Sequence, residues 1–144
     1  GPTQHLFNMV VKWAQQTDLP QGGKLIDQDW VQMNLAKVRA GVEALKLVCY
    51  KQAWAMSEGA LEMADASAAK VYGSEFFIEV YRALGEVIGQ FSTVSRHSDN
   101  AQELAAKIER MYRTASIITF GGGTNEIQRD IISAAGLWMP RAAR

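Results

Sequence analysis

The chain has 144 residues, of which 48% are hydrophobic, and its 15 lysines and arginines balance its 15 aspartates and glutamates. These values fit one globular domain with a core, exclude a disordered chain, and give no electrostatic reason to bind nucleic acid or an anionic membrane. One cysteine, two histidines and no apolar run of about 20 residues argue against a disulfide, a structural zinc site and a membrane span, so we expect a soluble, cytoplasmic domain without a metal.

The spacing of apolar residues predicts an all-α protein, an up-and-down bundle of about five helices. Apolar residues recur every three or four positions, whereas the strict alternation of a half-buried strand is hard to find. A first helix is expected over 3–17, where Leu6, Val10 and Ala14 share one face. The following segment, 18–26, holds a proline and two glycines and is predicted to be a loop.

Two longer helices are expected in the middle of the chain. The second begins at Asp27 as N-cap and ends at Glu58, before Gly59, and its apolar stripe includes Cys49, which we interpret as a buried packing residue. The third covers 66–91 and is apolar almost all round, which is typical of the middle of a bundle or of a subunit interface.

The polar, aperiodic segment 92–100 is predicted to be a mobile loop. Asp99 or Asn100 then caps a fourth helix that ends near Thr119. Both histidines are interpreted as solvated, since His97 lies in this loop and His5 in the first helical turn.

Three consecutive glycines, 121–123, break the chain before the last helix. Thr124 can cap that helix, which is expected to end near Ala135 with Gly136 as a left-handed stop. Glycines before a helix start allow backbone N–H groups to approach a phosphate or another polar cofactor group. The alternative from spacing alone is a flexible connection between two helices with a threonine cap.

The segment YRTASIITFGGGTNEIQR, 112–129, closely resembles the end of the acyl-CoA dehydrogenase C-terminal domain, and ASAAKVYGSE, 66–75, resembles the small-residue third helix of that domain. The resemblance covers essentially the whole chain. It implies a helical domain, 1–144, of a flavoenzyme that removes an α-proton from an acyl-CoA thioester while FAD takes a hydride from the β-carbon, giving a trans-2-enoyl-CoA. The family's N-terminal helical and middle β domains are expected to be absent from this chain, which would be inactive alone.

The resemblance also implies site residues. Gly123, Thr124 and Glu126 match family positions at the flavin in the glycine-rich turn and the start of the last helix. Gly122 stands where many members carry the catalytic glutamate, and another branch places its base upstream of this chain. We therefore expect no catalytic residue here.

Two family patterns for FAD binding are missing. The loop TDLPQGGKLI lacks the Arg-x-x-Phe-Gly stretch that holds the FAD pyrophosphate, and LGEVIGQF, 84–91, lacks the Gln-x-x-Gly-Gly pattern. Some bacterial members, including those acting on steroid side chains, form mixed tetramers with fewer flavins than subunits. The alternative function is therefore a non-catalytic structural partner subunit, and a third is an unrelated helical interaction module. The dehydrogenase domain and the structural partner subunit both imply a homo- or hetero-oligomer formed through the helical domain.

Overall fold

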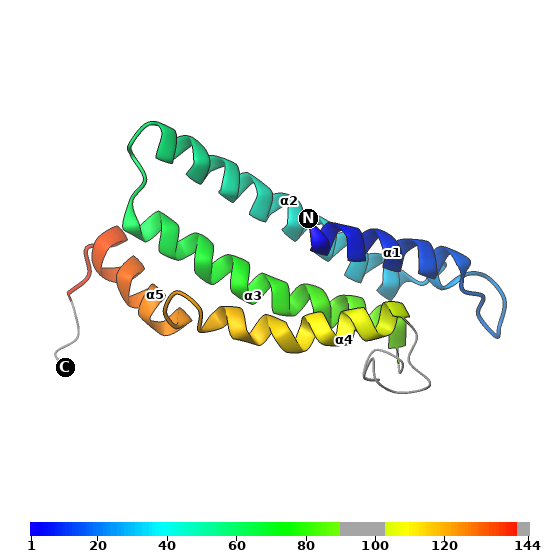
Figure 1. Ribbon diagram of the computed structural model, residues 1–144. Coiled ribbons are helices and arrows are strands. Elements are labelled where there is room, and N and C mark those ends of the chain that lie inside the picture. Colours follow the sequence, from blue (N-terminus) through cyan, green and yellow to red (C-terminus); the bar gives the residue numbers. More distant parts are fainter. Residues whose placement is uncertain (90–102, 141–144) are drawn as a thin grey trace.

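The computed structural model describes residues 1–89 and 103–140, and these form an elongated bundle of helices (Figure 1). Its α-helices are α1 (Pro2–Gln16), α2 (Asp29–Ser57), α3 (Met63–Ile88), α4 (Glu103–Ala115) and α5 (Asn125–Ile131). The described residues contain no strand, only an isolated bridge between Asp18 and Lys24. The expected all-α class is confirmed. No helix within these ranges is long and apolar enough to cross a membrane.

Helix α3 is the central element of the bundle and contacts α1, α2, α4 and α5. The largest fully buried side chains come from α1, α2, α3 and α4: Val10, Val31, Val80, Leu84 and Ile108. Burial on several sides explains why the third predicted helix is apolar almost all round. Of the two interpretations of that pattern, the middle of a bundle is confirmed.

The first connection is more ordered than a plain loop. A short 3-10 helix, η1 (Leu25–Asp27), precedes α2, and Asp27 Oδ2 accepts a hydrogen bond from the Lys24 N–H at 3.0 Å. The N-cap of α2 is Gln28, without a side-chain hydrogen bond. The prediction of Asp27 as cap was wrong because its carboxylate closes the preceding 3-10 turn.

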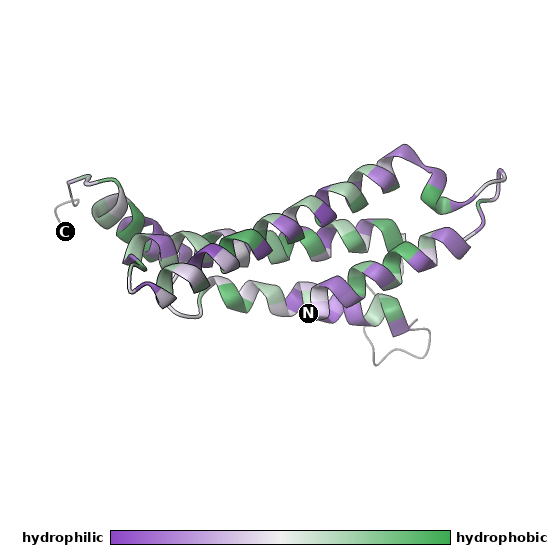
Figure 2. Cartoon of the chain, turned by 90° about the horizontal axis from the view of Figure 1, so that it is seen from above, coloured by the Kyte–Doolittle hydropathy of each residue, from purple (hydrophilic) through white to green (hydrophobic). Residues whose placement is uncertain are grey.

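The C-terminal half of α2 extends beyond the core of the bundle. Its first half buries Val31, Leu35 and Val38, whereas Cys49 in the second half is exposed. The interpretation of Cys49 as a buried residue was wrong, because the face of α2 that is turned toward α3 in this half runs through Val48, Gln52 and Ala55, and Cys49 lies beside that face. Figure 2 shows hydrophobic positions on outer surfaces as well as between the helices.

The link between α2 and α3 is short. Gly59 ends α2 with a φ of +68°, as the sequence indicated. Helix α3 then begins at Met63, three residues before the predicted start at Ala66. Its first turn is stabilised by tertiary packing, because Ala64 is buried against Gly136 from the end of the chain.

The last predicted stop also has a different structural reason. Helix α5 continues into a π-helical turn, η4 (Ile132–Gly136), and Gly136 is not among the glycines with positive φ. A Cβ at Gly136 would lie 2.9 Å from the Ala64 Cβ. The left-handed role predicted for Gly136 was wrong, and its lack of a side chain allows close packing on α3 instead.

Several predictions fall outside the described residues: the loop 92–100, the caps Asp99 and Asn100, His97, and the end of the third helix at Phe91. Within the described part, His5 is exposed, as expected. Helix α4 passes into the 3-10 helix η3 (Ser116–Thr119), so the helical segment ends where the sequence indicated.

Candidate functional site: the glycine-rich turn

The chain reverses between η3 and α5 through the three consecutive glycines. The Gly121 N–H donates to the Ile117 carbonyl at 3.1 Å, which closes the end of η3. Gly122 and Gly123 then take φ values of +71° and +94°. Residues other than glycine rarely adopt such backbone angles, so the turn favours glycine at both positions.

Thr124 begins α5 as predicted. Its backbone is extended, with φ −64° and ψ 157°, and its Oγ1 accepts a hydrogen bond from the Ile127 N–H at 3.4 Å. The expected N-cap is therefore confirmed, although the bond is long and so contributes at the weak end of the usual range. In the described part of the chain, the N–H groups of Gly122, Gly123 and Thr124 donate to no backbone carbonyl.

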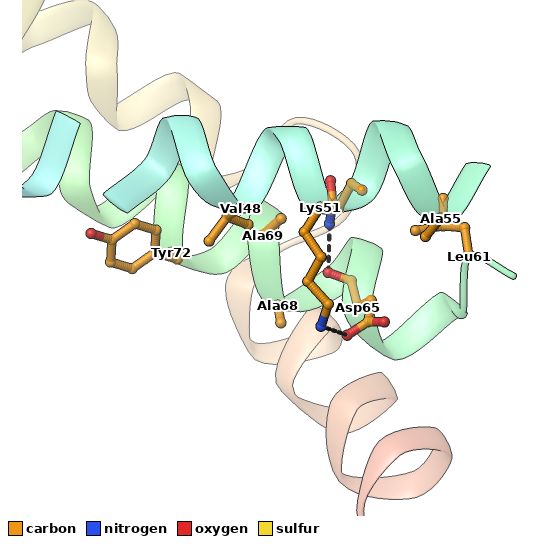
Figure 3. Close-up of a pocket in the computed structure, with 9 residues that line it drawn as sticks. Val48, Lys51, Ala55, Leu61, Asp65, Ala68, Ala69 and Tyr72 are labelled. Atoms are coloured by element: carbon orange, nitrogen blue, oxygen red, sulfur yellow. Dashed lines mark hydrogen bonds and ion pairs between the residues drawn. The ribbon is translucent and has the colours of Figure 1, made fainter. Parts of the chain in front are cut away.

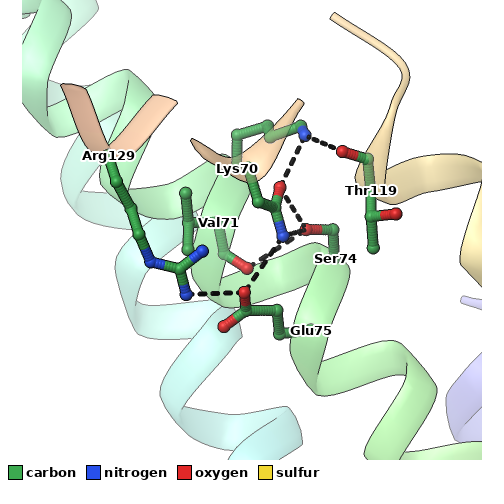
Figure 4. Close-up of polar contacts among 7 residues, drawn as sticks. Lys70, Val71, Ser74, Glu75, Thr119 and Arg129 are labelled. Carbon is green, nitrogen blue, oxygen red and sulfur yellow. Dashed lines mark hydrogen bonds and ion pairs between the residues drawn. The ribbon is translucent and has the colours of Figure 1, made fainter. Parts of the chain in front are cut away.

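Lys70 of α3 fixes the turn from the inner side (Figure 4). Its Nζ donates to the Thr119 carbonyl at 2.9 Å and the Gly123 carbonyl at 2.7 Å. A third bond, at 2.6 Å, goes to Oδ1 of Asn125, the first residue of α5. One ammonium group thus joins the end of η3, the turn and the start of the last helix.

Asn125 extends this contact into a network with α3. It is only 5% exposed, bonds Ser74 Oγ at 3.0 Å and donates to Glu75 Oε1 at 3.1 Å. The same carboxylate oxygen accepts a hydrogen bond from Arg129 Nη2 at 2.6 Å (Figure 4). We call Lys70, Ser74, Glu75, Asn125 and Arg129 the turn-anchoring network.

The turn-anchoring network joins the two segments that carry the family resemblance, 66–75 and 122–129. Sequence reasoning identified both segments but did not assign these residues to a site. A signal was present, because Lys70 and Ser74 are four residues apart and so lie on one face of the helix.

Glu126 points into solvent from the first turn of α5 and is exposed. A hydrogen bond from its own backbone N–H lowers its pKa most, and one from the Thr124 hydroxyl lowers it further. Desolvation opposes these two effects, and charge attraction from Arg129 and Lys70 lowers the pKa again. Glu126 is therefore an ionised acceptor at neutral pH.

The remaining predicted positions lie on the same exposed surface. A Cβ at Gly123 would be in tight contact, 3.0 Å from Nε2 of Gln128, whose side chain also donates to the Gly122 carbonyl at 2.7 Å. A Cβ at Gly122 would meet nothing within 4 Å. Gly122 thus faces open space but contributes no carboxylate.

The chain matches the family model described as "Acyl-CoA dehydrogenase, C-terminal domain" over residues 1–137. It belongs to the acyl-CoA dehydrogenase family. Membership confirms the fold and FAD as the cofactor class that the resemblance implied.

Relatives and solved structures agree. The chain is 49% identical over 138 residues to acyl-CoA dehydrogenase FadE26 of Mycobacterium tuberculosis, covering 94% of this chain and 34% of FadE26. It is 32% identical to FadE29 of the same organism, covering 100% of this chain and 36% of FadE29. The crystal structure of the ChsE4-ChsE5 complex from Mycobacterium tuberculosis superposes with a TM-score of 0.89 at 48% identity, covering 98% of this chain and 36% of that chain. The chain thus spans about a third of the length of the relatives that it matches.

In this acyl-CoA dehydrogenase domain the turn has an apolar rim, formed by exposed side chains that follow and precede the glycines: Ile117, Ile118, Phe120 and Ile127. Their exposed fractions run from 42% for Ile118 to 68% for Phe120. Grouped exposed apolar side chains of this size are typical of a surface that another domain or subunit covers.

A hollow of about 250 Å³ lies between the C-terminal half of α2 and the start of α3 (Figure 3). Its walls are largely apolar, and Lys51 and Asp65 lie at its edge with Nζ and Oδ1 3.8 Å apart. The residues of α3 that line it differ from those that hold the turn, so this hollow is separate from the glycine-rich turn.

Proposed function

We propose that this chain is the C-terminal domain of an FAD-dependent acyl-CoA dehydrogenase and that it contributes to FAD binding and oligomerisation. The longer, cytoplasmic protein would convert an acyl-CoA thioester to a trans-2-enoyl-CoA, with its N-terminal helical and middle β domains supplied by the rest of the subunit. The observation that carries this proposal is the turn 122–126, which exposes Gly122, Gly123 and Glu126 and which the turn-anchoring network ties to α3.

The exposed groups of the turn fit a flavin cofactor. Gly123 has no side chain to obstruct an approaching ligand, and Thr124 presents a hydroxyl beside it. Glu126 is ionised and would repel a pyrophosphate, so its partner should be a hydroxyl donor, such as those of the ribityl chain or ribose. When bound, FAD supplies the hydride acceptor of the reaction.

The general base must come from another part of the enzyme. Gly122 offers no group that can take the α-proton, and Glu75 is committed to Asn125 and Arg129. We therefore assign the base to the part of the subunit upstream of Gly1 or to a partner subunit.

A second candidate is a structural partner subunit in a heteromeric acyl-CoA dehydrogenase. Two features of the sequence favour this candidate: a glycine, Gly122, at one family position of the catalytic glutamate, and a loop, 17–26, that contains neither Arg nor Phe. So does the 48% identity to a chain of the ChsE4-ChsE5 complex, and a further similar structure, at 36% identity, is the Tcur3481-Tcur3483 steroid ACAD.

Exposed apolar side chains support oligomerisation in both cases. The surface first expected to drive it, on the third helix, is largely covered by the other helices. The exposed apolar residues lie instead on α2, where Leu47 is 66% and Trp54 64% exposed, and on the rim of the turn. Burial of these two surfaces would stabilise an assembly.

The test is the flavin content of the full-length protein, purified with any subunit that co-assembles. We expect bound FAD that an acyl-CoA substrate reduces, and we expect Thr124→Ala to lower the flavin content. Thr114→Ala is the matched control, since Thr114 is an exposed residue of α4 whose hydroxyl bonds only the Arg110 carbonyl within the part of the chain that the structure describes. Flavin in the assembly that is unaffected by Thr124→Ala would favour the structural subunit, and the absence of flavin from every assembly would refute both candidates. The 144-residue chain alone should bind no flavin stably and show no activity.

A further inference from the structure

Lys70 has no donor left for a ligand. A lysine ammonium carries three N–H donors, and here they meet the Thr119 carbonyl, the Gly123 carbonyl and Asn125 Oδ1 at 2.6–2.9 Å. Lys70 therefore differs from a lysine that binds a phosphate, because binding an anion would require it to release one of these contacts.

We propose that Lys70 is the positioning residue of the cofactor-facing turn, and that it acts on the flavin only by setting the conformation of Thr124 and Glu126. This inference rests on the proposed function of the turn. Gly123 immediately precedes Thr124, and Asn125 lies between Thr124 and Glu126. Two of the three Lys70 contacts, to the Gly123 carbonyl and the Asn125 side chain, thus hold the residues directly next to Thr124 and Glu126.

The geometry favours lysine over arginine at this position. The three acceptors lie on separate segments and converge on one nitrogen, which suits a compact tetrahedral ammonium better than a planar guanidinium. Thr119 is the last residue of η3, so its carbonyl lies at the negative end of that helix, where a cation is favourable.

The rest of the network orients Asn125 toward Lys70. The Asn125 amide donates to Ser74 and Glu75, and this leaves its Oδ1 to accept from the ammonium. Glu75 is held in turn by Arg129. Loss of Lys70 would release two carbonyls on either side of glycines that have positive φ, so the turn would sample other conformations while the distant core of the bundle stays intact.

Lys70→Met in the full-length holoenzyme tests this inference, with Lys107→Met as the matched control. Lys107 is an exposed lysine of α4 whose ammonium, among residues 1–89 and 103–140, pairs only with Glu103, four residues away on the same helix. We expect Lys70→Met to raise the Kd for FAD by about tenfold, which corresponds to the loss of one charge-assisted hydrogen bond between the misplaced turn and FAD. Lys107→Met should change the Kd by less than about twofold. Amide hydrogen exchange at Gly121, Ile127 and Gln128, whose N–H groups are hydrogen-bonded at the two ends of the turn, should accelerate in Lys70→Met only, at a temperature where circular dichroism shows both variants folded.

Thr124→Ala separates the two proposals. If Thr124→Ala weakens FAD binding and Lys70→Met does not, the positioning role is overturned and the proposed function stands. If neither variant changes the Kd, both are overturned. Should Lys70→Met fail to fold, Lys70→Arg decides, because it keeps the charge: weaker FAD binding at an unchanged melting temperature supports the role, and an unchanged Kd overturns it.

Discussion

Replacing Asn125 by alanine should destabilise the domain more than any other single change in the turn-anchoring network. The side chain is 5% exposed and bonds an ammonium, a carboxylate and a hydroxyl. Asn125→Ala leaves Lys70 with two acceptors and leaves Ser74 Oγ, which is buried, with only the Val71 carbonyl.

The magnitude follows from the partners. A hydrogen bond to a charged group contributes about 1.5–3 kcal/mol, and a buried neutral one about 1 kcal/mol. Because Lys70 and Glu75 are only half-buried, water compensates part of the charged contribution. We expect a loss of about 2–4 kcal/mol, or about 6–12 °C in melting temperature for a domain of this size.

Thermal and urea unfolding followed by circular dichroism measure this loss. Asn34→Ala is the control, since Asn34 makes one solvent-exposed hydrogen bond, to Glu86 at 3.2 Å, and its loss should cost less than about 0.5 kcal/mol. If Asn125→Ala costs no more than Asn34→Ala, the network does not stabilise the turn and the reasoning is refuted.

Three further predictions concern single side chains. Thr124→Ala should destabilise the chain by about 0.5–1 kcal/mol in urea unfolding, because its cap bond is long at 3.4 Å, and Thr124→Ser by less; equal losses would argue against the cap. Gly41→Ala should lower the melting temperature, because the new Cβ would lie 2.1 Å from the Phe76 ring. Overpacking costs about 1–3 kcal/mol, which outweighs the roughly 1 kcal/mol that alanine gains over glycine in helix propensity. A higher melting temperature would show that the ring moves aside freely. Because the pKa of Glu126 is lowered in the folded state, its carboxylate stabilises the fold above pH 4.5, the ordinary value, and this stabilisation is lost as the pH falls through the lowered pKa. The melting temperature of the wild type should therefore fall more than that of Glu126→Gln between about pH 6 and pH 3. Parallel curves of melting temperature against pH would contradict this.

Local signals in the sequence predicted much of the fold. Gly59 and Thr124 were identified correctly because a left-handed stop and an N-cap depend on a few neighbouring residues. The misassigned positions depend on distant contacts. Cys49 lies beside the face of α2 that is turned toward α3, and Gly136 packs against Ala64, 72 residues earlier in the chain.

The candidate site divides in the same way. The motif that contains Gly123, Thr124 and Glu126 is continuous in sequence, so its resemblance to the family was visible. Lys70 and its acceptor Asn125 are 55 residues apart, and only the packing of α5 on α3 brings them together. Apolar periodicity can place a helix in a bundle, but it does not specify which polar side chains meet across an interface.

The most direct test of the central claim is an experimental structure of the full-length assembly with FAD bound. The account predicts that the Thr124 hydroxyl and the Glu126 carboxylate lie within about 3 Å of polar atoms of the flavin cofactor, with Glu126 on a hydroxyl rather than on phosphate. A structure in which every FAD lies away from the turn 122–126 of this chain would contradict the account.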